Sequence, residues 1–117
     1  MAYVDGYVLP VKKDRIEEYR KIAQDAAAVW KEYGAREVVE TVAEDVQPGK
    51  LTSFPQAVQL QDDEVVVFSW ILYDSREQRD AVNAKVMQDE RIKAQMNDMP
   101  VDGQRMFWGG FDEIVRA

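Results

Sequence analysis

The sequence predicts an α+β fold of the ferredoxin-like type, with two main helices on one face of a four-stranded antiparallel sheet. Segments with strand and helix patterns follow one another in the order β-α-β-β-α-β. Apolar residues recur at spacings of three and four in the helical segments, and they fill almost every position of the third strand. With 117 residues the chain suits one domain, which we place at 1–117.

The first strand and the first helix are marked by their composition and by their ends. Tyr3–Leu9 has the residues of a strand, and Pro10, which has no backbone N–H, is expected to end it. Asp14 is suited to cap a helix because Glu17 follows three residues later, as in a capping box. Gly34 is expected to stop this helix. Its buried stripe is expected to consist of Ile16, Tyr19, Ala23, Ala26, Trp30 and Tyr33.

The middle of the chain is predicted to hold two strands separated by a long connection. Residues 36–45 have the pattern of the second strand. Val46–Leu60 contains two prolines and is long for a connection in a compact domain, so it is either a functional loop or partly strand. Glu64–Tyr73 is the clearest strand of the sequence.

The last third of the chain is predicted to supply the second main helix and the final strand. Ser75, with Gln78 three residues on, is expected to cap the helix, and Asp89 to cap a further helical turn. Pro100 ends the helical pattern. The final strand is expected at Arg105–Phe111.

The third strand is apolar on both faces, whereas a strand with one solvated face alternates with polar residues. Gly6 and Gly110 are expected to let the helices approach the sheet, which would put residues in the opposite register on the helix-free face. That face would then carry four aromatic side chains, Tyr7, Phe68, Trp70 and Phe107. Such a patch exceeds what a typical monomer exposes, so we expect a homodimer that buries it.

Composition and charge exclude several classes of function. The chain has no cysteine and no histidine, so it has no disulfide, no thiolate nucleophile and no histidine base. The net charge of −7 argues against a nucleic-acid partner. Because no apolar run is long enough to span a bilayer, we expect no membrane partner and a cytoplasmic location.

Six segments carry a further signal: Tyr3–Tyr7, Glu32–Ala35, Pro48–Lys50, Val67–Ile71, Arg79–Asn83 and Met99–Met106. They resemble the bacterial YbaA-like family, a family of unknown function in the dimeric α+β barrel superfamily. The resemblance covers nearly the whole chain and implies a ferredoxin-like fold that dimerises through its sheet, without implying an established activity. Other branches of that superfamily are cofactor-independent monooxygenases, lactone isomerases and haem enzymes. Because the haem branches usually bind iron through histidine, we expect neither a haem cofactor nor a bound metal here.

The candidate site residues are those expected on the helix-free face. Asp5 is a candidate general base, Tyr7 a candidate proton donor, and Arg105 a candidate partner for a carboxylate or enolate oxygen. Alternatively, Asp5 and Arg105 form an ion pair between neighbouring strands while the aromatic side chains only pack. The candidate substrate-binding residues are Phe68, Trp70 and Phe107.

Three functions follow from these residues. The first is binding of a small molecule in a cavity at the dimer face of the sheet. The second is a cofactor-independent isomerase or monooxygenase of an aromatic or enolisable substrate, and the third is a protein-interaction module that uses Val46–Leu60. The methionines of the C-terminal half are expected to fill the core or the interface: Met87, Met96, Met99 and Met106.

Overall fold

Four antiparallel strands form one sheet in the order β2-β3-β1-β4, as the computed structural model of residues 1–117 shows. This order, with crossovers through helices, confirms the predicted ferredoxin-like fold. β3 has the predicted bounds, whereas β2 is shorter than expected. The strands are β1 (Tyr3–Lys12), β2 (Glu37–Val42), β3 (Glu64–Tyr73) and β4 (Phe107–Asp112).

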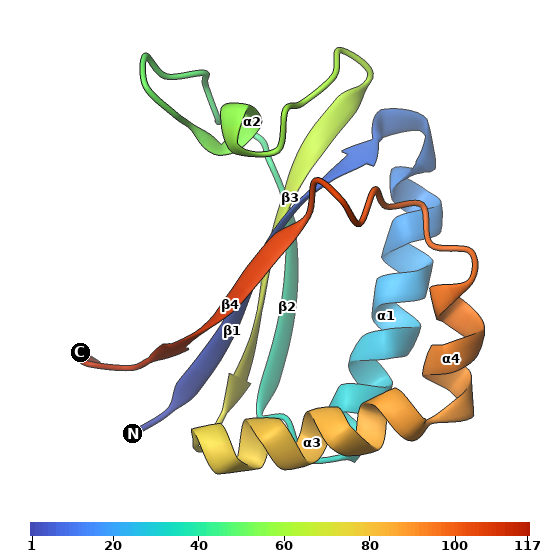
Figure 1. The fold of residues 1–117 in the computed structure, drawn as a ribbon, viewed down its shortest axis with the longest axis vertical. Helices are drawn as coiled ribbons and strands as arrows, with labels where there is room; N and C mark the ends of the chain where they lie inside the picture. The colour runs from blue at the N-terminus through green and yellow to red at the C-terminus, as the bar shows by residue number, and fades with distance from the viewer.

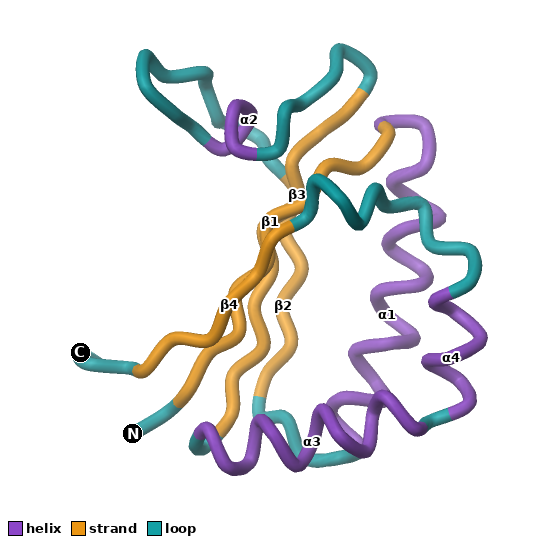
Figure 2. The backbone as a smooth tube through the Cα atoms, viewed as in Figure 1, coloured by secondary structure: helices purple, strands orange, loops and turns teal.

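The three longer helices lie on one side of the sheet, as Figures 1 and 2 show. They are α1 (Ile16–Glu32), α3 (Arg76–Gln88) and α4 (Glu90–Met96). The long connection lies on the other side and contains one short helix, α2 (Phe54–Ala57), and no strand. None of the helices combines the length and apolar character needed to cross a membrane.

Side-chain caps mark the starts of α2, α3 and α4. The Ser75 hydroxyl accepts from the backbone N–H of Gln78 at 3.1 Å, and Asp89 accepts from that of Arg91 at 2.8 Å, so both predicted caps are confirmed. Gly34 follows α1 with φ of 121°, which confirms it as the stop. The predicted capping box at Asp14 is wrong, because Asp14 lies in a 3₁₀ turn that precedes α1.

Two strand boundaries differ from those expected. β1 continues through Pro10 to Lys12. β4 begins only opposite Val8, so no β4 residue pairs with Pro10 and the missing N–H costs no hydrogen bond to that strand. β4 begins at Phe107, which leaves Arg105 in the preceding turn.

The pairing of β1 with β3 decides which side chains face the helices. Tyr7 stands opposite Ser69, and the odd-numbered residues of both strands share the helix side. The same side receives Glu40 of β2 and Trp108 of β4 through their own registers. Tyr7 therefore lies beneath the helices, and its predicted place on the helix-free face is wrong.

Three separate apolar clusters hold the layers together. One cluster joins α1, α3 and α4 to the ends of the strands, and includes Val29, Tyr73 and Val86. A second joins the start of α1 to the opposite end of the sheet through Tyr19 and Val67. The third lies on the helix-free face, where the connection around α2 covers Val8, Val58 and Val66.

Much of the helix-free face is still uncovered. Phe68 and Phe107 lie on this face as predicted. Phe111 lies on the same face, and Phe54 of α2 contacts Phe68 there. Phe68 also contacts Trp70, with 5.6 Å between ring centroids. The exposed fractions are 41% for Phe68, 44% for Phe107, 46% for Phe54 and 63% for Phe111. The two-faced apolar pattern of β3 thus corresponds to a buried helix side and an open aromatic side.

The two neighbouring glycines of β4 have different surroundings. A methyl group added to Gly110 would meet the buried Tyr3 ring, with its hydroxyl only 2.2 Å away, whereas one added to Gly109 finds ordinary contact at 3.7 Å. Gly6 pairs with Gly109 on the helix-free face, so it does not admit a helix as we expected. Gly110 makes room for Tyr3 and not for a helix.

Gly110→Ala is expected to lower the free energy of unfolding by about 1–3 kcal/mol, because the Tyr3 ring has to move out of its buried position. Gly109→Ala is the matched control and should change the stability by less than ~0.5 kcal/mol. Urea unfolding followed by tryptophan fluorescence measures both. Equal effects of the two substitutions would contradict this explanation of Gly110.

Candidate functional site

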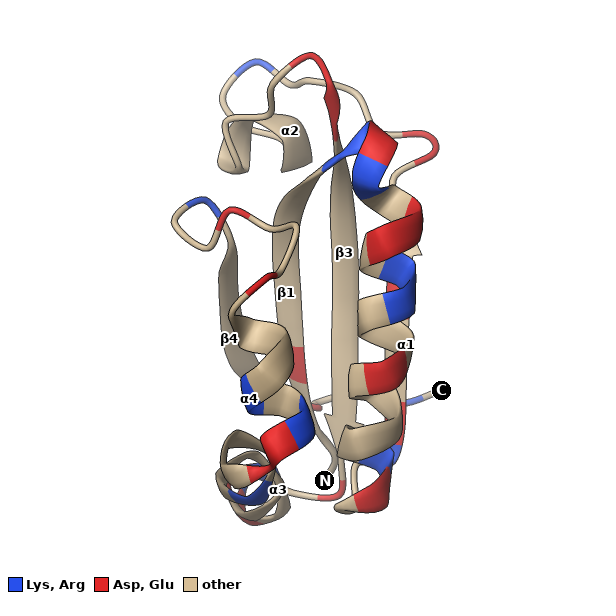
Figure 3. Ribbon diagram, turned by 90° about the vertical axis from the view of Figure 1, so that its right-hand side faces the viewer, with Lys and Arg blue, Asp and Glu red and all other residues tan.

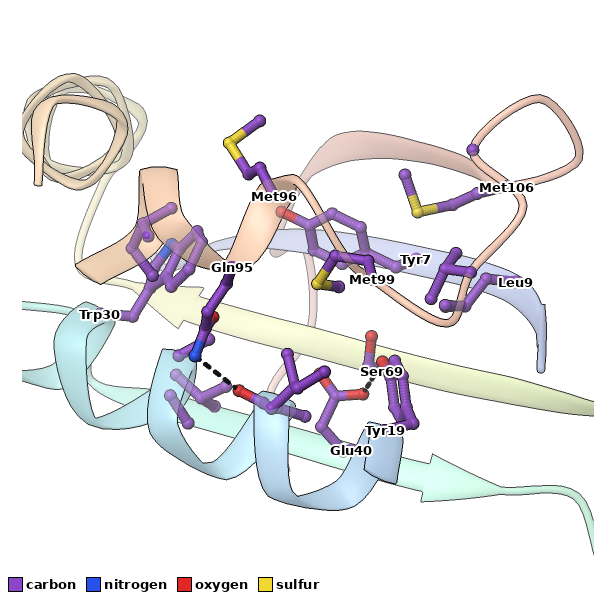
Figure 4. A pocket seen from close by; sticks show the side chains of 18 of the residues that line it. Tyr7, Leu9, Tyr19, Trp30, Glu40, Ser69, Gln95, Met96, Met99 and Met106 are labelled. Atoms are coloured by element: carbon purple, nitrogen blue, oxygen red, sulfur yellow. Dashed lines mark hydrogen bonds between the residues drawn. The ribbon is translucent and has the colours of Figure 1, made fainter. Parts of the chain in front are cut away.

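A cavity of about 610 Å³ lies between the sheet and helices α1 and α4. It separates the two apolar clusters on the helix side, and its walls include Leu9 and Tyr19 from one cluster and Ile71 and Ile92 from the other. Figure 4 shows the side chains that line it. Cavities of this size and mainly apolar lining are typical of small-molecule sites.

The floor of the cavity is one row of residues across three strands. Tyr7 of β1 stands opposite Ser69 of β3, and Ser69 stands opposite Glu40 of β2. Because neighbouring strands lie ~4.8 Å apart, the three side chains stand next to one another. Ser69 is the smallest of the three and is 3% exposed, so the floor is deepest at its hydroxyl.

The roof consists of small residues of α1 and methionines of the C-terminal segment. Ala23, Ala26 and Ala27 keep the α1 side of the roof thin, so the helix backbone leaves space above the sheet. All four methionines predicted as filler line the cavity instead. Thioether side chains are flexible and polarisable, so this roof can adjust to ligands of different shape.

Glu40 carries the carboxylate nearest the floor. Its Oε1 accepts a hydrogen bond of 2.5 Å from the Tyr19 hydroxyl, which Figure 4 marks. Glu40 is exposed toward the cavity opening, but the apolar groups around it raise the pKa of its carboxyl, against the smaller effect of the Tyr19 hydrogen bond. No group of carboxylates is close enough to hold a metal ion.

Tyr7 presents the second polar group of the row. Its ring stacks on Trp108 with 5.9 Å between centroids, which fixes its direction. Burial raises the pKa of Tyr7, so its hydroxyl keeps its proton and remains available as a donor. Tyr7 is therefore the only one of the three predicted catalytic candidates that lines the cavity.

Asp5 lies on the helix side but outside the cavity. Its Oδ1 accepts a hydrogen bond of 2.7 Å from the guanidinium of Arg79, which also lies over the Tyr3 ring. Its Oδ2 is buried without a hydrogen-bond partner, and burial raises the pKa of the carboxyl more than Arg79 lowers it. The expected ion pair with Arg105 is wrong, since Arg79 of α3 occupies that role.

Arg105 is held at the opposite end of the sheet. Its guanidinium donates to both carboxylate oxygens of Glu64, at 2.7 and 2.6 Å, and to Asp102 at 2.8 Å. It also donates to the backbone oxygen of Gln59 at 3.1 Å. These contacts tie the long connection to the turn before β4. Arg105 therefore lies away from Asp5 and Tyr7, and the prediction that it lies beside them is wrong.

The three predicted substrate-binding aromatics lie on the helix-free face, on the other side of the sheet from this cavity. Three residues that line the cavity were not predicted as site residues from the sequence: Glu40, Ser69 and Tyr19. Two of them do interrupt apolar patterns, because Ser69 is the one polar residue in 65–72 and Glu40 alternates with Val38 and Val42. Only the pairing of β2 with β3 shows that Glu40 and Ser69 stand opposite each other.

Comparisons with known proteins agree with this fold. The family model described as "Protein of unknown function (DUF1428)" matches residues 2–103. The chain is 50% identical over 115 residues to "Uncharacterized protein YbaA" of Escherichia coli, covering 98% of both chains. A NIPSNAP domain protein from Burkholderia xenovorans has a TM-score of 0.59 at 16% identity, covering 98% of this chain and 97% of the other. A putative antibiotic biosynthesis monooxygenase from Nitrosomonas europaea has a TM-score of 0.57 at 10% identity, covering 97% and 90%. At such identities these two structures share the fold alone.

Glu64→Gln tests whether Arg105 is a structural residue. The ion pair with Arg105 lowers the pKa of Glu64 from 4.5 to about 2, so its stabilisation is present above pH 4.5 and is lost as the pH falls toward 2. The substitution is expected to cost about 2 kcal/mol at pH 7, and less as the pH falls through that range.

Urea unfolding at several pH values measures this effect. Glu44→Gln, which changes an exposed glutamate outside any ion pair, should change the stability by less than ~0.5 kcal/mol throughout. A cost for Glu64→Gln that stays the same from pH 7 to pH 2.5 would show that the ion pair does not produce it.

Proposed function

The chain belongs to the DUF1428 family of proteins of unknown function, and we propose that it binds a small, mainly apolar molecule in the cavity beneath α1 and α4. The observation that carries the proposal is the floor of this cavity, where Tyr7, Ser69 and Glu40 form a polar row inside apolar walls. Apolar walls supply affinity, and a few placed polar groups fix the orientation of a ligand.

The sequence predicted a cavity at the helix-free face of the sheet, whereas this cavity lies on the helix side. The site lies under the helices and within one chain, and not at the open face of the sheet. The proposed isomerase or monooxygenase loses support, because Asp5 and Arg105 are each engaged in an ion pair away from the cavity. Binding is the function that the remaining geometry supports best.

We also propose that the helix-free face joins two copies of the chain. At about 200 Å² for a fully exposed ring, its four phenylalanines alone expose roughly 400 Å², before the partly exposed Val4, Trp70 and Leu72 are added. The rings alone therefore lie within the ~300–600 Å² of the largest apolar patch on a typical monomer, a patch that is often functional, and do not exceed it as the sequence predicted. A stable interface buries ~800 Å² per partner, so the proposed dimer has to bury neighbouring side chains of this face as well as the rings.

Ser69→Leu tests the cavity, because the added carbons fill the deepest part of its floor. We expect the wild type to bind the neutral probe N-phenyl-1-naphthylamine with a rise in probe fluorescence. In Ser69→Leu the dissociation constant should rise at least ~10-fold, since the probe loses its space. Ser69→Ala keeps the space and should stay within ~3-fold of the wild type. Circular dichroism checks that both variants are folded. Unchanged binding in Ser69→Leu would exclude this cavity as the probe site.

Phe68→Asp tests the proposed dimer. Phe68 is central on the helix-free face, so a buried aspartate there would disrupt the interface. Sedimentation equilibrium should give the wild type twice the chain mass of 13.5 kDa and the variant the mass of one chain. Leu51→Asp changes an exposed apolar residue of the long connection and should leave the wild-type mass. A wild-type protein of single-chain mass at micromolar concentration would contradict the proposed dimer.

A further inference from the structure

The cavity is lined by carboxylates without a compensating basic residue. Glu40 and Asp98 are the acidic residues among those lining it, and the same lining has no lysine and no arginine. The remaining polar groups are uncharged hydroxyls and amides, such as Ser69, Gln95 and Asn97. An anionic ligand would therefore meet like charge and no cation, which disfavours carboxylates and phosphates.

Glu40 forms no ion pair within the chain, although most acidic residues of α1 and α3 have a basic neighbour. Figure 3 shows this alternation of charge along the outer face of α1. Arg20 lines a second, outer groove that Glu40 also borders, but it pairs with Glu17 at 3.5 Å. Inside the cavity, Tyr19 alone bonds to Glu40, and it uses only Oε1. The second carboxylate oxygen remains available to a donor on a ligand.

Ser69 gives an independent indication of a ligand at the same place. Its side chain is almost completely buried and points into the cavity beside Glu40. The hydrogen bonds between protein groups in this region, Tyr19 to Glu40 and Gln95 to the Ile22 oxygen, do not include its hydroxyl. The oxygen can be reached from the cavity, because the one fully buried side-chain polar atom without a partner is Oδ2 of Asp5. The Ser69 hydroxyl is therefore free to bond to a ligand or to water.

Aromatic side chains favour the same kind of ligand. Tyr7, Tyr19 and Trp30 line the cavity, and ring faces attract cations. The indole N–H of Trp30 donates to Asn83 at 3.2 Å, which holds that ring in place. A cation near Glu40 is thus bordered by rings as well as by a carboxylate.

Building on the proposed function, we propose that the ligand is a small apolar amine bound as its cation. Its ammonium group donates to Glu40 and Ser69, and its hydrocarbon part lies under the alanines of α1 and the methionines that follow α3. Binding then supplies the positive charge that the chain itself does not place in this cavity.

The test compares ligands that share one skeleton and differ in charge. Displacement of N-phenyl-1-naphthylamine is measured with 2-phenylethylamine, 2-phenylethanol and phenylacetate, which are cationic, neutral and anionic at pH 7.5. We expect the amine to displace the probe at a concentration at least ~10-fold below that of the alcohol, with phenylacetate the weakest. In Glu40→Gln the amine should lose this advantage over the alcohol, because the variant offers no negative charge at that position.

Glu37→Gln is the matched control, because Glu37 lies on the same strand but on the other face of the sheet. It should keep the preference for the amine. The preference should also fall as the pH is lowered through the raised pKa of Glu40, since protonation removes the charge that the amine meets. The other ionisable groups bordering this site are Asp98, Tyr19, which stays neutral over this range, and Arg20, which is paired with Glu17.

The outcomes separate this inference from the function on which it rests. Equal displacement by amine and alcohol, or strongest displacement by phenylacetate, would overturn the amine assignment and leave the binding site standing. An amine preference that survives in Glu40→Gln would overturn the role of Glu40. If the wild type binds neither the probe nor any of the three compounds, both the inference and the proposed function fail.

Discussion

The pairing of β1 with β3 is the constraint on which the rest of the structure depends. Because side chains alternate along a strand, this register alone decides that Tyr7 and Ser69 point toward the helices and Phe68 and Trp70 point away. A shift of β3 by one residue would move Phe68 and Trp70 under the helices and Ser69 to the open face, which would separate Ser69 from Tyr7. The apolar clusters on each side resist such a shift, since Val67 packs with Tyr19 and Val66 with Val58.

The two faces of the sheet are therefore suited to different tasks. The helix side encloses a cavity because α1 presents alanines at its middle and Ser69 is small, so neither layer fills the space between them. The other side carries large rings that the connection around α2 covers only in part. One side is suited to a small molecule and the other to a flat protein surface.

The sequence allowed the fold to be predicted but not the site. Strand β3, the stop at Gly34 and the caps at Ser75 and Asp89 follow from local patterns, and the structure has them at those positions. The site depends on which residues meet across strands, and glycine placement was a poor guide because Gly110 accommodates Tyr3 instead of a helix. For the same reason the partners of Asp5 and Arg105 could not be predicted, because Arg79 of α3 and Glu64 at the start of β3 are far from them in sequence.

Intermolecular NOEs between bound N-phenyl-1-naphthylamine and methyl-labelled protein test the central claim most directly. Strand β3 offers methyl groups on both sides of the sheet, with Ile71 facing the cavity and Leu72 facing away. With the probe bound beneath the helices, we expect NOEs to Ile71 and Leu9, and none to Leu72 or Val66. NOEs to Leu72 and Val66 without any to Ile71 would place binding on the open face and contradict the account.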